Sequence, residues 1–168
     1  MRRIILVLVS ALVGIMLTAT PALAGTGGTG NPHFQFASNS INGAGTLTTS
    51  FKEVGLGTGI SSVVITLNAD ATALYQCFNN GGNHPKAGNK ETVQSHLQTS
   101  GTFPVSNGNA TGGLSVGPPG PGGFACPSGQ TLFLQSVTYS NTIVSDAFGH
   151  SIDASPDPIS SGTLHTPA

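Results

Sequence analysis

Apolar and polar side chains alternate along most of the chain after residue 32, in short segments separated by clusters of Gly, Asn, Ser and Pro. Alternation with a period of two places apolar side chains on one face of a β-strand, and no segment shows a sustained helical stripe with capping residues. The pattern predicts strands at residues 34–36, with Phe34 and Phe36 on one face, and at residues 47–51, 60–67, 72–78, 92–100, 131–139 and 142–148.

The strand pattern predicts an all-β fold, an antiparallel β-sandwich of about seven or eight strands over residues 33–168 as a single domain. A small barrel is the alternative. The sandwich is favoured because one side of most strands is rich in Thr, Ser and Gln while the other side is apolar. An immunoglobulin domain in the strict sense is not expected, because the chain has no Trp and Cys126 falls in a Pro- and Gly-rich loop.

The first 24 residues have the three parts of a secretory signal peptide. Arg2 and Arg3 precede an apolar run, and Ala22 and Ala24 provide the small residues that a signal peptidase reads. The run is shorter than the ~20 apolar residues that span a bilayer, so we expect cleavage after Ala24 rather than an anchor. Residues 25–32 are expected to form a flexible Gly/Thr-rich tail, and the protein is expected to be secreted, with no membrane association after cleavage.

Cys77 and Cys126 are the two cysteines of the chain. Export places them in an oxidising compartment, so the sequence predicts a disulfide between them. Closing a loop of about 50 residues contributes roughly 4 kcal/mol in the chain-entropy model. A catalytic thiol would instead need one of the two cysteines to be free.

Charged residues make up 7% of the chain, against roughly 25% in an ordinary soluble domain. Without the two arginines of the leader, the chain has three lysines, six acidic residues and no arginine. Nucleic acid is therefore not an expected partner, because phosphate recognition needs a basic surface. So few charges also exclude a coiled coil and charge-driven disorder.

A long polar loop over residues 79–90 follows the predicted strand that carries Cys77. Amide side chains both donate and accept hydrogen bonds, which suits sugar hydroxyls, a protein partner or a cell-wall surface. The candidate ligand-binding residues are Asn79, Asn80, Asn83, His84, Lys86, Asn89 and Lys90. The alternative is a turn-rich connection between two strands, and the only aromatic residues nearby are Tyr75 and Phe78.

Three acidic residues near the C-terminus, Asp146, Asp153 and Asp157, are candidate calcium ligands. Calcium takes carboxylate and carbonyl oxygens from loops of this kind, although the spacing is not that of an EF-hand. The alternative is a solvated acidic turn. No histidine pair has the spacing of a zinc site, so no other cofactor is predicted.

The sequence contains no recognisable set of catalytic residues. His150, Ser151 and Asp153 lie close together in the chain, whereas nucleophile, base and orienting acid normally come from separate elements. No G-x-S-x-G elbow is present either. We therefore expect that the protein is not an enzyme.

Several segments together resemble small secreted proteins of actinobacteria, a group of unknown function: residues 45–57, 75–80, 126–130 and 137–141, with the leader. The resemblance covers most of the chain after the leader and includes no catalytic motif. It implies an exported bacterial protein and transfers no functional residue.

Three hypotheses about function follow. The first is a secreted, non-enzymatic binding module that acts outside the cell or at its surface. The second is a small extracellular hydrolase that uses His and Asp residues, with or without calcium. The third is a structural envelope protein whose Gly-, Thr- and Ser-rich faces associate with copies of itself.

Overall fold

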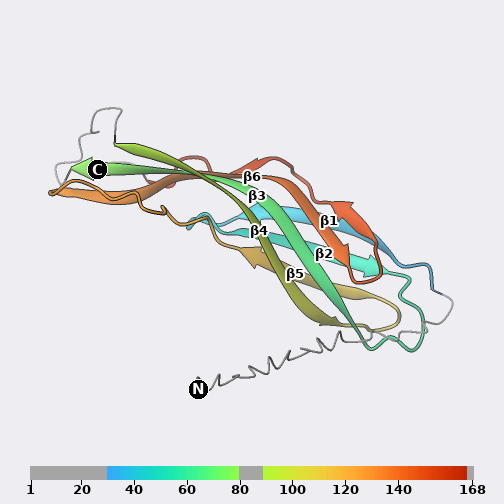
Figure 1. The fold of residues 1–168 in the computed structure, drawn as a ribbon. Helices are drawn as coiled ribbons and strands as arrows, with labels where there is room; N and C mark the ends of the chain where they lie inside the picture. Colours follow the sequence, from blue (N-terminus) through green and yellow to red (C-terminus); the bar gives the residue numbers. More distant parts are fainter. Residues whose placement is uncertain (1–29, 80–88, 166–168) are drawn as a thin grey trace, which may run out of the picture.

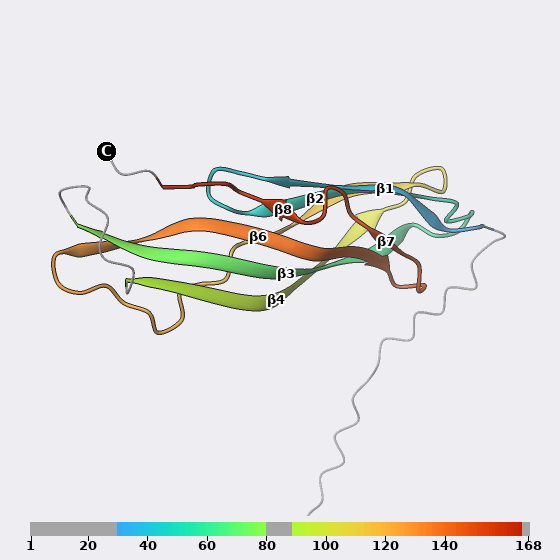
Figure 2. The same cartoon turned by 90° about the horizontal axis from the view of Figure 1, so that it is seen from above.

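The computed structural model describes residues 30–79 and 89–165, and these form two antiparallel sheets packed face to face (Figures 1 and 2). The predicted all-β sandwich is confirmed, with eight strands. No helix occurs among the described residues, so none of them forms a helix able to span a bilayer. The strands are β1 (His33–Ile41), β2 (Leu47–Val54), β3 (Ser62–Asn79), β4 (Lys90–Pro104), β5 (Ala110–Val116), β6 (Gln130–Asp146), β7 (Ser151–Asp153) and β8 (Ile159–Ser160).

The smaller sheet, sheet A, has the strand order β1-β2-β5. The larger, sheet B, has the order β4-β3-β6-β7, and the short β8 also pairs with β6. β5 lies against β4 at one edge of the sandwich, and β1 contacts β7 and β8 at the other (Figure 2). Backbone hydrogen bonds from Asn39 to Ser155 and from Ser155 to Ala37 join the two sheets at this second edge.

Two of the long strands each join segments that the sequence pattern predicts as separate. β3 includes residues 62–67 of the first predicted segment and all of 72–78, and β6 spans most of 131–148. β6 contains a bulge near Asn141, whose φ is 52°. On β3, opposite this bulge, the pairing register shifts between Asn68 and Asp70. Such a bulge lets one strand continue while its inward side chains stay on the core face.

The predicted shared face of Phe34 and Phe36 is wrong. The register of β1 against β2 shifts between these two residues, which places Phe34 in the core and leaves Phe36 44% exposed. One extra residue in a strand reverses the side-chain alternation beyond it, and the sequence pattern alone does not show where that happens.

An aromatic cluster fills the core between the sheets. The rings of Phe34 and Phe103 both contact Phe51 edge-on, with centroids 6.2 and 4.8 Å away. Phe103 projects from β4 over β5 and lies above Gly112, where a Cβ atom would come within 2.4 Å of the ring. Gly112 therefore permits the close approach of β4 and β5 at this edge of the sandwich.

We expect Gly112→Ala to destabilise the fold by about 1–3 kcal/mol, because the added methyl group displaces the Phe103 ring in a packed core. Gly113→Ala on the same strand is the matched control, since a Cβ atom there meets its nearest neighbour at 3.6 Å. Urea unfolding of the two variants measures the difference. Equal stability of the two would show that Phe103 does not require the glycine.

Candidate functional site

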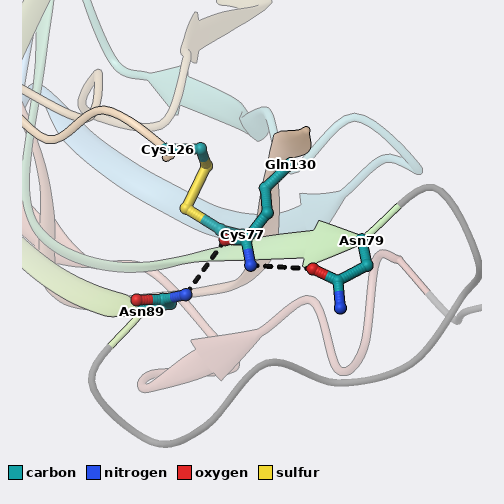
Figure 3. Close-up of a disulfide and its surroundings, with 5 residues drawn as sticks. All are labelled: Cys77, Asn79, Asn89, Cys126 and Gln130. Carbon is teal, nitrogen blue, oxygen red and sulfur yellow. Dashed lines mark hydrogen bonds between the residues drawn. A yellow bond between two sulfur atoms is a disulfide. The ribbon is translucent and has the colours of Figure 1, made fainter. Parts of the chain in front are cut away.

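The disulfide between Cys77 and Cys126 is confirmed, with 5.6 Å between the Cα atoms (Figure 3). It joins the end of β3 to the loop that precedes β6, as the sequence predicts. Pro119 in this connection also accepts a 2.7 Å hydrogen bond from the buried Tyr75 hydroxyl. The Pro- and Gly-rich segment is therefore attached to β3 at two places.

The polar loop begins and ends beside this disulfide. The Gln130 side chain lies between the two flanking amides: it accepts from Asn89 at 2.9 Å and donates to Asn79 at 2.7 Å (Figure 3). Lys90 begins β4 and is exposed. The remaining predicted ligand-binding residues, Asn80, Asn83, His84 and Lys86, lie outside the described residues. A binding role for the loop stays a prediction, and the two described asparagines hold its ends together.

The three acidic residues predicted as calcium ligands have different surroundings. Asp146 is the last residue of β6 and faces the inside of the sandwich, whereas Asp153 is exposed on β7. Asp157 accepts a hydrogen bond from the backbone N–H of Thr142 at 3.2 Å. Among the described residues, Asp146 is grouped with Glu53 and His150 instead, and the other two aspartates are not part of that group.

Glu53, Asp146 and His150 form a cluster between the sheets, at the end of the sandwich away from the disulfide. Glu53 comes from β2 in sheet A, Asp146 from β6 in sheet B, and His150 from the loop before β7. One ligand atom of each residue lies within 4.8 Å of the other two. The position of Glu53 follows from the alternation in β2, since Leu47, Thr49 and Phe51 are buried on the same face.

Glu53 is fully buried, and neither of its carboxyl oxygens receives a hydrogen bond from a protein N–H or O–H group. Its polar neighbour is the carboxyl group of Asp146. Burial, together with the hydrogen bond and the negative charge of Asp146, raises the pKa of Glu53 to about 8. At neutral pH and without a bound metal ion, the carboxyl group of Glu53 is therefore expected to be protonated.

Asp146 is the ionised member of this pair. Burial acts to raise its pKa, but hydrogen bonds from Glu53, from His150 and from two backbone N–H groups outweigh burial and lower the pKa. The Oδ1 atom accepts from the N–H groups of Phe148 and His150, each at 2.8 Å. The Oδ2 atom accepts from His150 Nδ1 at 2.7 Å. The loop backbone thus fixes the orientation of the Asp146 carboxylate.

The outer face of sheet B carries a second polar arrangement. Four successive cross-strand pairs on β3 and β4 point their polar side chains away from the core: Thr66–Ser100, Asn68–Gln98, Asp70–His96 and Thr72–Gln94. Three of these pairs are joined by side-chain hydrogen bonds of 2.7 to 2.9 Å. We refer to these eight residues as the polar ladder.

A shallow hollow of about 410 Å³ lies over one end of the polar ladder, lined in part by Asp70, Thr72, Gln94 and His96. Asp70 accepts hydrogen bonds from Asn141 at 2.8 Å and from His96 at 2.7 Å, and these bonds lower its pKa. A different hollow of about 610 Å³ lies near the end of β2 and is lined largely by glycines and asparagines. None of the described residues that line this second hollow is ionisable.

Comparison with protein-family models, with curated proteins and with solved structures finds no match to this chain.

The raised pKa of Glu53 predicts a pH-dependent stability in buffer that contains a chelator. Glu53 binds its proton more tightly in the folded protein than in the unfolded chain, where the pKa is near 4.5. The free energy of unfolding should therefore fall as pH rises from about 4.5 to about 8, by up to ~1.4 kcal/mol per pH unit. Urea unfolding between pH 4 and 9 measures this slope.

Glu53→Gln is the matched variant, because its amide can donate to Asp146 and cannot ionise. Its stability should lose this dependence on pH. A wild-type stability that is flat or rising between pH 5 and 8 would contradict a protonated Glu53.

Proposed function

We propose that the protein is a secreted, non-enzymatic binding module, and that it binds a neutral, hydroxyl-rich polymer of the glycan class on the outer face of sheet B. The observation that carries this proposal is the polar ladder, in which hydroxyl, amide and carboxylate–imidazole pairs follow one another along two long strands. The predicted signal peptide and the disulfide Cys77–Cys126 support export.

The side chains of the ladder are oriented in advance. In the Asn68–Gln98 pair, the Gln98 amide nitrogen donates to the Asn68 oxygen. The amide oxygen of Gln98 and the NH₂ group of Asn68 can still form hydrogen bonds with a ligand. Side chains that are already ordered lose less entropy on binding. The ladder thus offers fixed donors and acceptors at the regular spacing of a β-strand.

The composition of this face favours a neutral ligand. Asp70 is the one acidic residue of the ladder, and it is paired with His96. A face with so little charge offers no electrostatic attraction to nucleic acid or to a strongly charged polymer. Because the groups on the ladder both donate and accept hydrogen bonds, hydroxyl groups are the partners that match them best.

A pair of identical substitutions tests the proposal. Ser100→Lys places a long charged side chain on the ladder, whereas Ser50→Lys places it on the exposed outer side of β2 in sheet A. We expect the wild-type protein to be retained by at least one of three insoluble neutral polysaccharides: cellulose, chitin and β-1,3-glucan. Ser100→Lys should weaken that retention about tenfold or more, and Ser50→Lys should leave it unchanged.

Two results would contradict this assignment. Absence of retention on all three polymers would remove the proposed ligand class. Retention that survives Ser100→Lys but is lost when residues 80–88 are shortened would place the binding site in the loop instead.

Self-association is a second candidate, favoured by the edge of sheet B. β4 is the terminal strand of that sheet and pairs with β3 without a bulge over its whole length. Between Thr92 and Phe103 it carries no Asp, Glu, Lys, Arg or Pro. Natural edge strands usually carry charges, prolines or bulges that prevent pairing with other chains. This regular edge therefore suits antiparallel pairing with the β4 strand of a second copy.

Sedimentation velocity at increasing protein concentration tests this candidate. Pairing through β4 predicts dimers whose population rises with concentration and falls in Val93→Lys, since a lysine on the partly buried side of an edge strand opposes pairing. A monomer at all concentrations would exclude the strand-pairing candidate.

A further inference from the structure

We propose that Glu53, Asp146 and His150 together bind one divalent transition-metal ion, of which Zn²⁺ is the best-matched example, at the end of the sandwich between β2 and β6. The proposal concerns a different place from the polar ladder and does not depend on the binding function assigned to that surface.

The sandwich buries two carboxyl groups side by side at this place. The side chain of Asp146 is 0% exposed and Glu53 is 0% exposed, so two carboxyl groups face each other out of contact with water. No lysine or arginine forms an ion pair anywhere in the described part of the chain. Buried carboxyl groups require a cation, a proton or hydrogen-bond donors, and Glu53 receives no hydrogen bond from the protein.

The donor atoms of the three residues are close enough to share one ion. The three ligand atoms lie within 4.8 Å of one another, and they come from both sheets and from the adjacent loop. Metal–ligand bonds of about 2.0–2.2 Å need ligand atoms roughly 3–4 Å apart, so small side-chain rotations suffice to close the site. The two backbone N–H groups that bond to Asp146 already hold one ligand in place.

The chemical nature of the donor atoms indicates the class of metal. Two carboxylates and one imidazole form a mixed oxygen and nitrogen set, which suits Zn²⁺ and neighbouring transition metals. Ca²⁺ takes six to eight oxygen ligands and is a poorer match for a site with three side chains, one of them a histidine. The metal class inferred here thus differs from the calcium expected for Asp146, Asp153 and Asp157.

The site also has a route to solvent. The His150 side chain is 40% exposed, whereas Asp146 behind it is not exposed at all. An ion can therefore arrive from the His150 side and meet the carboxyl groups last. In zinc sites with three protein ligands, a water molecule takes the fourth position.

The test uses the untagged secreted protein, stripped with EDTA and transferred to a non-chelating buffer at pH 7.5. Isothermal titration with Zn²⁺ should give saturable binding of one ion per chain, and Zn²⁺ should raise the thermal unfolding midpoint. Ca²⁺ at the same concentration should raise it much less. Glu53→Gln and His150→Ala should each weaken Zn²⁺ binding by at least about tenfold.

A second histidine–aspartate pair in the same molecule provides the control. His96 Nδ1 lies 2.7 Å from Asp70, the same distance as in the His150 pair, but both side chains are exposed and no buried carboxyl group is beside them. His96→Gln should therefore keep the wild-type affinity for Zn²⁺. Since His150 lies in a partly exposed loop, His150→Ala tests the site even if Glu53→Gln does not fold.

Several results would overturn the proposal. One is the absence of saturable Zn²⁺ binding at one ion per chain, which would leave a shared proton as the sole occupant between Glu53 and Asp146. Another is wild-type affinity in both site variants. A third is loss of Zn²⁺ binding in His96→Gln, which would place the ion on the outer face of sheet B.

Discussion

The face-to-face packing of two sheets excludes water from the space between them, and the rest of the molecule depends on this exclusion. Alternate side chains of β2, of most of β3 and of the second half of β6 are buried there, and most of these side chains are apolar. Glu53 lies on the same face of β2 as Leu47 and Phe51, and this face packs against sheet B. The carboxyl group of Glu53 is therefore buried together with these apolar side chains. Because Asp146 lies opposite this face of β2, the packing itself creates a site that needs a proton or a metal ion.

The two ends of the sandwich differ in what holds them. At one end the disulfide and the Asn79–Gln130–Asn89 bridge fix the ends of β3 and β4 (Figure 3). At the other end Glu53, Asp146 and His150 join sheet A to sheet B. Cys77 and Ile65, the β3 partner of Asp146, are 12 residues apart on one strand, or about 40 Å. Between the two ends, the polar ladder lies on the outer face of β3 and β4.

Much of this fold follows from the sequence because burial on one face imposes a period of two. That period predicts the sandwich, and the presence of two cysteines in an exported chain predicts the disulfide. The period does not predict the bulges near Phe36 and Asn141, which depend on pairing with the neighbouring strand. The pattern also does not predict β5, because Gly112 and Gly113 interrupt the alternation of apolar and polar residues. In the structure, Phe103 lies above Gly112. Glu53 lies two residues beyond the predicted strand 47–51. Its proximity to Asp146, 93 positions later in the chain, is seen only in the structure.

Burial between the sheets requires that the carboxyl group of Glu53 is neutralised rather than solvated. Carbon-13 NMR of the glutamate side-chain carboxyl groups, recorded from pH 3 to pH 10 on metal-free protein, measures its protonation directly, and Glu53→Gln identifies its signal. We expect this carboxyl group to be still protonated at pH 7, with a pKa of about 8, and saturating Zn²⁺ to remove the proton. A Glu53 signal that titrates near pH 4.5 and is unaffected by Zn²⁺ would contradict this expectation.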